Sequence, residues 1–228
     1  MKYIIIGLGN FGASLAEKLT QAGHEVIGVD NDMDKVEAYK TNITHTINLD
    51  CRIQQAAEHL PLKDTDVVIV CIGEDEGANL MVTALMKHLE VKRLISRAIS
   101  PLHETVLEAM GIKEIIHPEK ETADRWTKKL TITGVVDSFS LSGDYGIIEA
   151  TVPERIVGKK LGDMDLINDY GILVMTIIKV FEKKNMIGVS REVTEVQGVA
   201  SSETLLEKDD ILVIYGRIKN IKQFLNEG

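Results

Sequence analysis

Short apolar runs alternate with amphipathic stretches through roughly the first half of the chain. The runs have the length of buried strands, and the stretches between them repeat their apolar residues at the spacing of a helix. The expected strands cover residues 2–6, 25–29, 43–49, 67–70, 93–96 and 114–116. The expected helices cover residues 11–22, 32–40, 51–59, 77–89, 101–110 and 119–130. This alternation predicts an α/β fold whose parallel, doubly wound sheet is covered by helices on both faces.

The pattern changes after about residue 131, where apolar and polar positions alternate as they do in strands with one solvated face. Strands are expected at residues 133–141, 146–152, 172–178 and 210–215, and short helices near 160–168 and at 217–226. The polar segment 182–204 predicts a hairpin or a mobile excursion. We therefore expect a second, smaller α+β domain. The expected boundaries are 1–117 for the first domain, 118–132 for a linker helix and 133–228 for the second domain.

The first expected strand leads directly into a glycine-rich turn. Gly7, Gly9 and Gly12 form the pattern G-x-G-x-x-G between an expected strand and an expected helix. Such a Rossmann turn directs free backbone N–H groups and the positive end of the helix dipole toward a phosphate. Asp30 ends the second strand, where a carboxylate can accept hydrogen bonds from ribose hydroxyls. The pattern predicts nucleotide binding, and the charge of Asp30 disfavours NADP because it repels a 2′-phosphate.

Further polar residues follow the other expected strands, and ligands of such sheets bind beyond the carboxyl ends of the strands. Asp50 could bond an adenine or a ribose, or it could cap the next helix. Gly73 and Glu74 stand in a turn that either faces a ligand or merely joins a strand to a helix. Arg97 could reach a phosphate or form a surface ion pair. The residues expected at the nucleotide are Gly7, Leu8, Gly9, Asn10, Phe11, Gly12, Asp30, Asn31, Asp50, Cys51, Ile72, Gly73, Glu74 and Arg97.

Composition narrows the possible partners. The 228 residues carry a net charge of −9 that is spread over both halves, so neither nucleic acid nor acidic lipid is an expected partner. No apolar stretch approaches the roughly 18 residues of a membrane span, and the first strand begins at Lys2, so we expect neither membrane insertion nor a signal peptide. Cys51 and Cys71 are expected to be free thiols in the cytoplasm.

Candidates for metal binding and catalysis are weaker. His117, Glu119 and Glu121 offer one imidazole and two carboxylates, which do not make a structural zinc site. The remaining histidines are scattered, and we expect them at the surface or at helix caps. The second domain offers no evident acid–base pair for hydride transfer, so an NAD-dependent oxidoreductase is the alternative rather than the main hypothesis.

Together these residues resemble the RCK (KTN) regulators of bacterial potassium transport, the KtrA and TrkA proteins. The resemblance rests on residues 5–12, 28–30, Asp50, residues 70–75 and residues 117–120, and it continues into the second domain at residues 158–161 and 171–174. It implies a regulatory subunit that is not an enzyme. Such subunits form dimers and commonly octameric rings beneath a membrane potassium channel or translocating subunit, and ATP, ADP or NAD(H) in the cleft changes the shape of the ring.

The resemblance also implies roles for individual positions. The cleft residues named above would hold the nucleotide, and Glu119 matches a position that helps to hold a divalent or monovalent cation between paired subunits. The second domain of some relatives binds cyclic di-AMP, and Ile167 and Asn168 fall in the comparable region. The chain departs from the family at Asn10, where arginine is common, and this departure favours NAD(H) over strict selection of ATP. The expected helix at 119–130 is the hinge or crossover.

Overall fold

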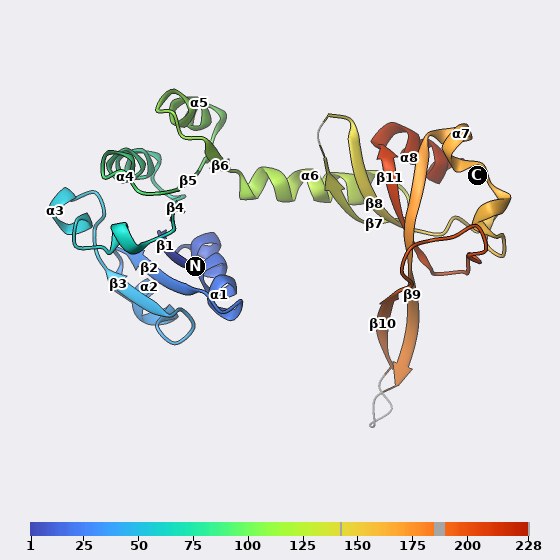
Figure 1. Ribbon diagram of the computed structural model, residues 1–228, viewed down its shortest axis with the longest axis horizontal. Coiled ribbons are helices and arrows are strands. Elements are labelled where there is room, and N and C mark those ends of the chain that lie inside the picture. The colour runs from blue at the N-terminus through green and yellow to red at the C-terminus, as the bar shows by residue number, and fades with distance from the viewer. Residues whose placement is uncertain (142, 185–189, 228) are drawn as a thin grey trace. The chain divides into compact units, whose positions relative to one another are not determined.

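The computed structural model describes residues 1–141, 143–184 and 190–227. Its chain divides into two compact units, Met1–Glu119 and Lys120–Gly228, which are drawn in Figure 1. In the described residues, no helix is both long enough and apolar enough to span a bilayer.

A parallel sheet forms the centre of the first unit. Its strands are β1 (Lys2–Ile6), β2 (Glu25–Asp30), β3 (His45–Asn48), β4 (Val67–Val70), β5 (Leu94–Arg97) and β6 (Glu114–Ile116). They lie in the order β3-β2-β1-β4-β5-β6, and each pairs in parallel with its neighbours. The order reverses between β1 and β4, which places the switch point of the sheet beside the glycine-rich turn. The predicted doubly wound fold is confirmed.

Buried side chains lie on both faces of this sheet. Ile4 and Ile6 pack in a cluster with Met86, whereas Ile5 packs on the opposite face with Ala16. The connecting helices are α1 (Asn10–Gln21), α2 (Met33–Tyr39), α3 (Gln54–Ala57), α4 (Glu76–His88) and α5 (Pro101–Ala109), with a 3₁₀ turn at Leu62–Asp64. Two-sided burial explains why the strands are continuous apolar runs rather than alternating ones.

Local capping fixes where these helices begin. The carboxylate of Asp32 accepts a hydrogen bond from the Asp34 N–H at the start of α2. Asp75 does the same for Ala78 at the start of α4. The expected helix at 51–59 is wrong in extent, because α3 spans only Gln54–Ala57. The residues before it form a turn instead, which is closed by the carboxylate of Asp50.

The second unit is built on an antiparallel sheet, whose buried side chains form one core cluster with residues of two short helices. Helix α6 (Pro118–Thr131) begins at the end of the first unit and continues into the second. The strands are β7 (Val135–Ser140), β8 (Tyr145–Thr151), β9 (Ile172–Lys184), β10 (Ser190–Val196) and β11 (Ile211–Arg217), in the order β10-β9-β11-β8-β7. The helices are α7 (Leu166–Tyr170) and α8 (Ile218–Asn226), with 3₁₀ turns at Glu154–Ile156 and Leu161–Asp163. Phe224 of α8 is fully buried against Ile148 and Leu212 of the sheet.

The polar segment expected at 182–204 is a hairpin where the structure describes it. Strands β9 and β10 pair antiparallel, with Val193 opposite Phe181. Residues 185–189 of that segment lie outside the described residues. The hairpin alternative is therefore confirmed for the paired strands, although β9 extends well beyond the strand expected at 172–178.

His103 lies at the N-terminal cap of α5, one of the two places expected for the histidines, and its backbone N–H donates to the Oγ of the capping Ser100. Its ring is only 2% exposed, and its Nδ1 accepts a hydrogen bond of 3.4 Å from the Ile99 N–H. Within the described chain, its Nε2 has no hydrogen-bond partner. Burial lowers the pKa of His103, and the nearby charge of Glu76 opposes this shift.

This burial predicts acid sensitivity of the fold. Because the pKa of His103 is lower in the folded chain, the unfolded chain binds the proton more readily, so stability is lost as the pH falls below about 6.5 toward the folded value. Replacing His103 with Leu should reduce the loss of stability between pH 8 and pH 5.5, measured by urea unfolding of the full chain. The exposed His59, replaced in the same way, is the control. Equal pH slopes for the wild type and His103→Leu would contradict this prediction.

Candidate nucleotide-binding site

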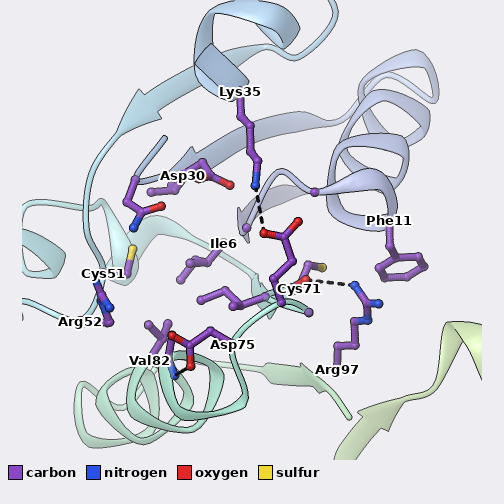
Figure 2. Close-up of a pocket in the computed structure, with 18 of the residues that line it drawn as sticks. Ile6, Phe11, Asp30, Lys35, Cys51, Arg52, Cys71, Asp75, Val82 and Arg97 are labelled. Atoms are coloured by element: carbon purple, nitrogen blue, oxygen red, sulfur yellow. Dashed lines mark hydrogen bonds and ion pairs between the residues drawn. The ribbon is translucent and has the colours of Figure 1, made fainter. Parts of the chain in front are cut away.

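A cavity opens beyond the carboxyl ends of the parallel strands, at the switch point between β1 and β4. Its volume is ≈ 480 Å³, which lies within the range of small-molecule sites. Figure 2 shows lining side chains, which come from the last residues of β1, β2 and β5, from the turns that follow the strands, and from helices α1, α2 and α4. The expected residues that line it are Gly7, Gly9, Asn10, Phe11, Asp30, Asn31, Asp50, Cys51, Ile72, Gly73, Glu74, Arg97 and Glu119. The structure thus brings together residues that are far apart in the sequence.

The three glycines of the turn differ in what they contact. Gly7 has a φ of +99°, which favours glycine, and a Cβ there would lie 2.9 Å from the backbone nitrogen of Ile72. A Cβ on Gly12 would lie 1.9 Å from the carbonyl oxygen of Gly7. A Cβ on Gly9 would have no described atom within 4 Å. Gly7 and Gly12 are therefore required by packing, whereas Gly9 only keeps the cavity open.

The N-terminus of α1 faces this cavity without a competing side chain. Gly9 precedes the helix and, in the described chain, no side chain caps it. The first turn of α1 carries no acidic residue. The backbone N–H groups at this end and the helix dipole both favour an anion. The turn can therefore accept a phosphate group.

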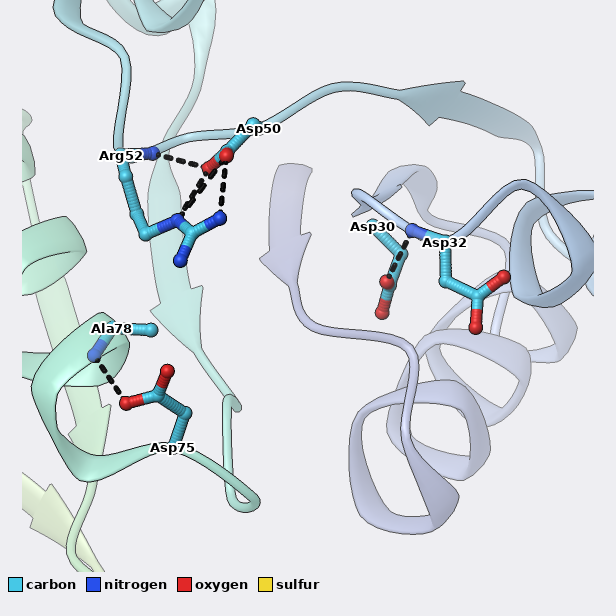
Figure 3. A network of polar contacts seen from close by, with 6 residues as sticks. All are labelled: Asp30, Asp32, Asp50, Arg52, Asp75 and Ala78. Carbon is cyan, nitrogen blue, oxygen red and sulfur yellow. Dashed lines mark hydrogen bonds and ion pairs between the residues drawn. The ribbon is translucent and has the colours of Figure 1, made fainter.

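Asp30 ties the turn to the end of β2. It is 8% exposed, and its carboxylate accepts hydrogen bonds from the Leu8 N–H at 2.7 Å and the Asp32 N–H at 2.9 Å, the latter drawn in Figure 3. Each carboxylate oxygen can accept a further hydrogen bond, so contact with a ribose stays open to Asp30. Leu8 itself is 1% exposed and packs in the core, so its side chain does not line the described cavity. Gly12 is also buried and, like Leu8, does not line the described cavity.

The wall beyond β3 is formed by Asp50, Cys51 and Arg52. The Asp50 carboxylate accepts hydrogen bonds from the backbone N–H of Arg52 at 3.0 Å and from its guanidinium at 2.7 and 2.9 Å (Figure 3). These bonds hold the pKa of Asp50 below its usual range. The capping alternative for Asp50 is wrong, because α3 begins only at Gln54. Burial raises the pKa of the Cys51 thiol to about 12, so this side chain is neutral.

Arg97 reaches over the floor of the cavity. A Cβ on Gly73 would lie 2.4 Å from its Nη1, so a side chain there would displace the guanidinium from this position. The guanidinium lies 5.8 Å from the centre of the Phe11 ring, and its Nη1 donates to the Cys71 carbonyl at 3.4 Å (Figure 2). Its Nη2 pairs with the carboxylate of Glu119. Its Nε is buried and, among the described residues, has no acceptor.

Glu119 does not stand in a cluster of metal ligands. Across the described residues, no three His, Cys, Asp or Glu side chains converge on one point. The carboxylate instead pairs with Arg97, so a cation at Glu119 stays a prediction that depends on ligands from elsewhere.

Sequence analysis missed three charged residues of the lining. The Nζ of Lys35 in α2 lies 3.7 Å from a carboxylate oxygen of Glu74 (Figure 2). Arg52 and Asp75 are the other two charged residues that line the cavity. A signal existed for Arg52, which stands two residues after Asp50, the spacing at which a carboxylate closes a turn on its own backbone. No comparable signal distinguishes Lys35 from the other charges of α2.

Comparison with known proteins defines the family. A family model for the TrkA-N domain matches residues 3–118, and the chain belongs to this family. The Ktr system potassium uptake protein C of Bacillus subtilis (strain 168) is 32% identical over 223 residues, which cover 98% of this chain and 95% of that protein. The Ktr system potassium uptake protein A of the same organism is 30% identical and covers 100% and 96% of the two chains. The resemblance drawn from the motifs is confirmed.

Solved structures agree with the fold. The GsuK RCK domain superposes with a TM-score of 0.66 at 16% identity and covers 100% of this chain and 48% of that chain. The GsuK channel bound to NAD gives a TM-score of 0.64 at 16% identity, over 98% of this chain and 39% of that chain. The chain therefore spans about half or less of these solved chains. At this identity the likeness establishes the fold alone.

The different environments of Gly9 and Gly12 make a matched pair of variants. Gly12→Ala should destabilise the first unit by at least about 2 kcal/mol, because its methyl group would overlap the Gly7 carbonyl. Gly9→Ala should leave the free chain as stable as the wild type, because φ at Gly9 is −66° and the methyl group meets no described atom. It should weaken nucleotide binding about tenfold or more, because the methyl group would occupy the phosphate position.

Thermal unfolding and calorimetric titration with ADP measure the two effects separately. A Gly9→Ala chain that binds ADP as tightly as the wild type would show that no phosphate approaches this turn.

Proposed function

We propose that this chain is a nucleotide-binding regulatory subunit of a membrane potassium channel or transporter, and not an enzyme. The observation that carries the proposal is the glycine-rich turn at the switch point of the sheet, where no side chain caps the N-terminus of α1 in the described residues. The chain also matches two Ktr potassium uptake proteins along nearly their whole length. The turn supplies a phosphate site, and the relatives supply the physiological setting.

The proposed ligand is ATP, ADP or NAD(H), and not NADP. The turn and the guanidinium of Arg97 favour a diphosphate, which all of these share. The buried carboxylate of Asp30 supports rejection of NADP. The 2′-phosphate of NADP would place its negative charge beside this carboxylate, where little solvent screens the repulsion. NAD is bound in one of the solved structures of similar fold, the GsuK channel.

The proposed assembly is a homo-oligomer, a ring of dimers and an octamer by family resemblance, which lies on the cytoplasmic side of its membrane partner. We propose residues 118–132 as the linker helix between the domains 1–117 and 133–228. A ligand can shift such a ring only by its differential affinity for two shapes. Glu119 could pass a change at the ligand on to the linker helix, since it lines the cavity and also stands in the first turn of α6.

Two further ligands belong to the proposal by family resemblance alone. A divalent or monovalent cation at Glu119 would draw its other ligands from a paired subunit or from the nucleotide. Cyclic di-AMP would bind the second domain near Ile167 and Asn168, where Ile167 is 62% exposed and available for contact.

Calorimetric titration of the purified chain with ATP, ADP, NAD⁺, NADH, NADP⁺ and cyclic di-AMP tests the proposal. At least one of ATP, ADP, NAD⁺ and NADH should bind at least about tenfold more tightly than NADP⁺. The bound nucleotide should be recovered unchanged after prolonged incubation, and it should alter the potassium flux of the reconstituted partner. Absence of binding by all of these nucleotides, or hydride transfer to a substrate, would contradict the proposal.

The Arg97–Glu119 pair yields a second prediction. Glu119 competes with a ligand phosphate for the guanidinium, so Glu119→Gln should raise the affinity for ADP about threefold to tenfold in the absence of divalent cations. The affinity for adenosine, which has no phosphate, should not change. Glu108→Gln removes the same charge from an exposed position of α5 outside the cavity and is the control. Weaker ADP binding by Glu119→Gln under these conditions would show that the carboxylate is not a competitor.

A further inference from the structure

A polar side chain lies fully buried beside the cavity, at a point where an apolar residue would be expected. Asn79 stands in the first turns of α4 with 0% exposure. Its Nδ2 donates to the carbonyl oxygen of Ile72 at 2.9 Å and to that of Arg97 at 3.2 Å. One amide group therefore joins the backbones that follow β4 and end β5.

The two strands diverge where this amide enters. Strands β4 and β5 pair through Val70 and Ser96, and Ile72 and Arg97 lie beyond that pair. The backbone of Arg97 pairs onward with Ile116 of β6 instead. The Asn79 amide thus bridges β4 and β5 at the place where their own pairing has ended.

The orientation of the amide is set by its other end. Its Oδ1 accepts hydrogen bonds from the hydroxyls of Ser96 at 3.0 Å and Thr83 at 3.3 Å, and these hydroxyls lie 2.9 Å from each other. Both hydroxyl residues are 0% exposed. Rotating the amide by 180° would place its oxygen against two carbonyl oxygens, which cannot donate. The network therefore has one arrangement in which every buried amide atom is satisfied.

The bridge fixes the relative position of two parts of the cavity that contact each other. Gly73 follows Ile72 directly, and its Cα lies so close to the Arg97 guanidinium that a Cβ would be 2.4 Å from Nη1. Phe11 and Glu119 contact only the far end of the arginine side chain. The start of this side chain is held by the backbone of Arg97, which pairs with Ile116 of β6 on one side and accepts the Asn79 amide on the other. Asn79 is the contact that ties it to the turn carrying Gly73.

We propose that Asn79 is a positioning residue of the cavity, which holds Arg97 where its guanidinium can meet a ligand phosphate. The proposal rests on the proposed nucleotide binding. Asn79 does not line the described cavity, so it acts through Arg97 and not by contact with the ligand.

The readout is the affinity gained from phosphates, measured as the ratio of the dissociation constants of adenosine and ADP by calorimetric titration. Asn79→Ala should lower this ratio about tenfold, because the charge-assisted contact made by Arg97 is weakened. In an Arg97→Gln background, the same substitution should leave the ratio unchanged. Thr65→Val is the matched control, because Thr65 is a buried threonine of the same unit whose hydroxyl donates to Pro61 outside the cavity.

Ser96→Ala and Thr83→Val serve if Asn79→Ala does not fold, since each removes one hydroxyl that orients the amide and leaves both carbonyl contacts in place. Each should lower the ratio about twofold to threefold. The inference is overturned if these variants and Asn79→Ala keep the wild-type ratio, or if the loss persists in the Arg97→Gln background. If the wild-type chain binds no nucleotide, the proposed function is overturned as well. If the wild-type chain binds ADP and the variants show the same ratio of dissociation constants, only the role of Asn79 is overturned.

Discussion

The arrangement of the cavity depends on the close contact between the first turn of α1 and the turn that precedes it. A side chain at Gly12 would overlap the Gly7 carbonyl and would come within 2.9 Å of the Cys71 Cβ. The helix can therefore begin directly above the ends of β1 and β4, where the strand order reverses. This contact aims the free N–H groups of the helix at the space in which a ligand must lie. The hydrogen bond from the Leu8 N–H to Asp30 then joins the turn to the end of β2.

An acidic chain with an acidic cavity can still accept an anion, because the carboxylates of the lining already have partners. Asp30 accepts backbone N–H groups, and Asp75 caps α4. The remaining carboxylates of the lining pair with basic side chains, Asp50 with Arg52, Glu74 with Lys35 and Glu119 with Arg97. The formal charge of the lining therefore overstates the repulsion that a phosphate would meet. What remains unopposed is the helix N-terminus, whose dipole acts within about one turn.

The features that could be predicted from the sequence are those that local spacing determines. The strand positions, the glycine-rich turn and Asp30 all follow from patterns within about thirty residues. The alternation of strands and helices indicates a parallel, doubly wound sheet, but it does not determine the order of the strands. The rest depends on pairs that are distant in sequence. Arg97 meets Glu119 and Gly73, and Asn79 meets Ser96, only after the strands have assembled. A buried Asn in a helix gives no periodic signal, since one polar residue on an apolar face resembles an exposed position until its partners are known.

Glu119 connects the cavity to the start of α6, and under the proposed function the nucleotide and a cation would act on this one group. Its carboxylate pairs with Arg97, and that guanidinium is also the partner that a ligand phosphate would take. Phosphate and carboxylate therefore oppose each other. A cation at Glu119 would act in the other sense, because it would draw the carboxylate away from Arg97 and leave the guanidinium to the phosphate. By linkage, a cation that strengthens nucleotide binding is itself bound more tightly when the nucleotide is present. Occupancy of the cavity and of a cation site would then reach the first turn of α6 as one coupled signal, without any change in the tightly packed turn at Gly7 and Gly12.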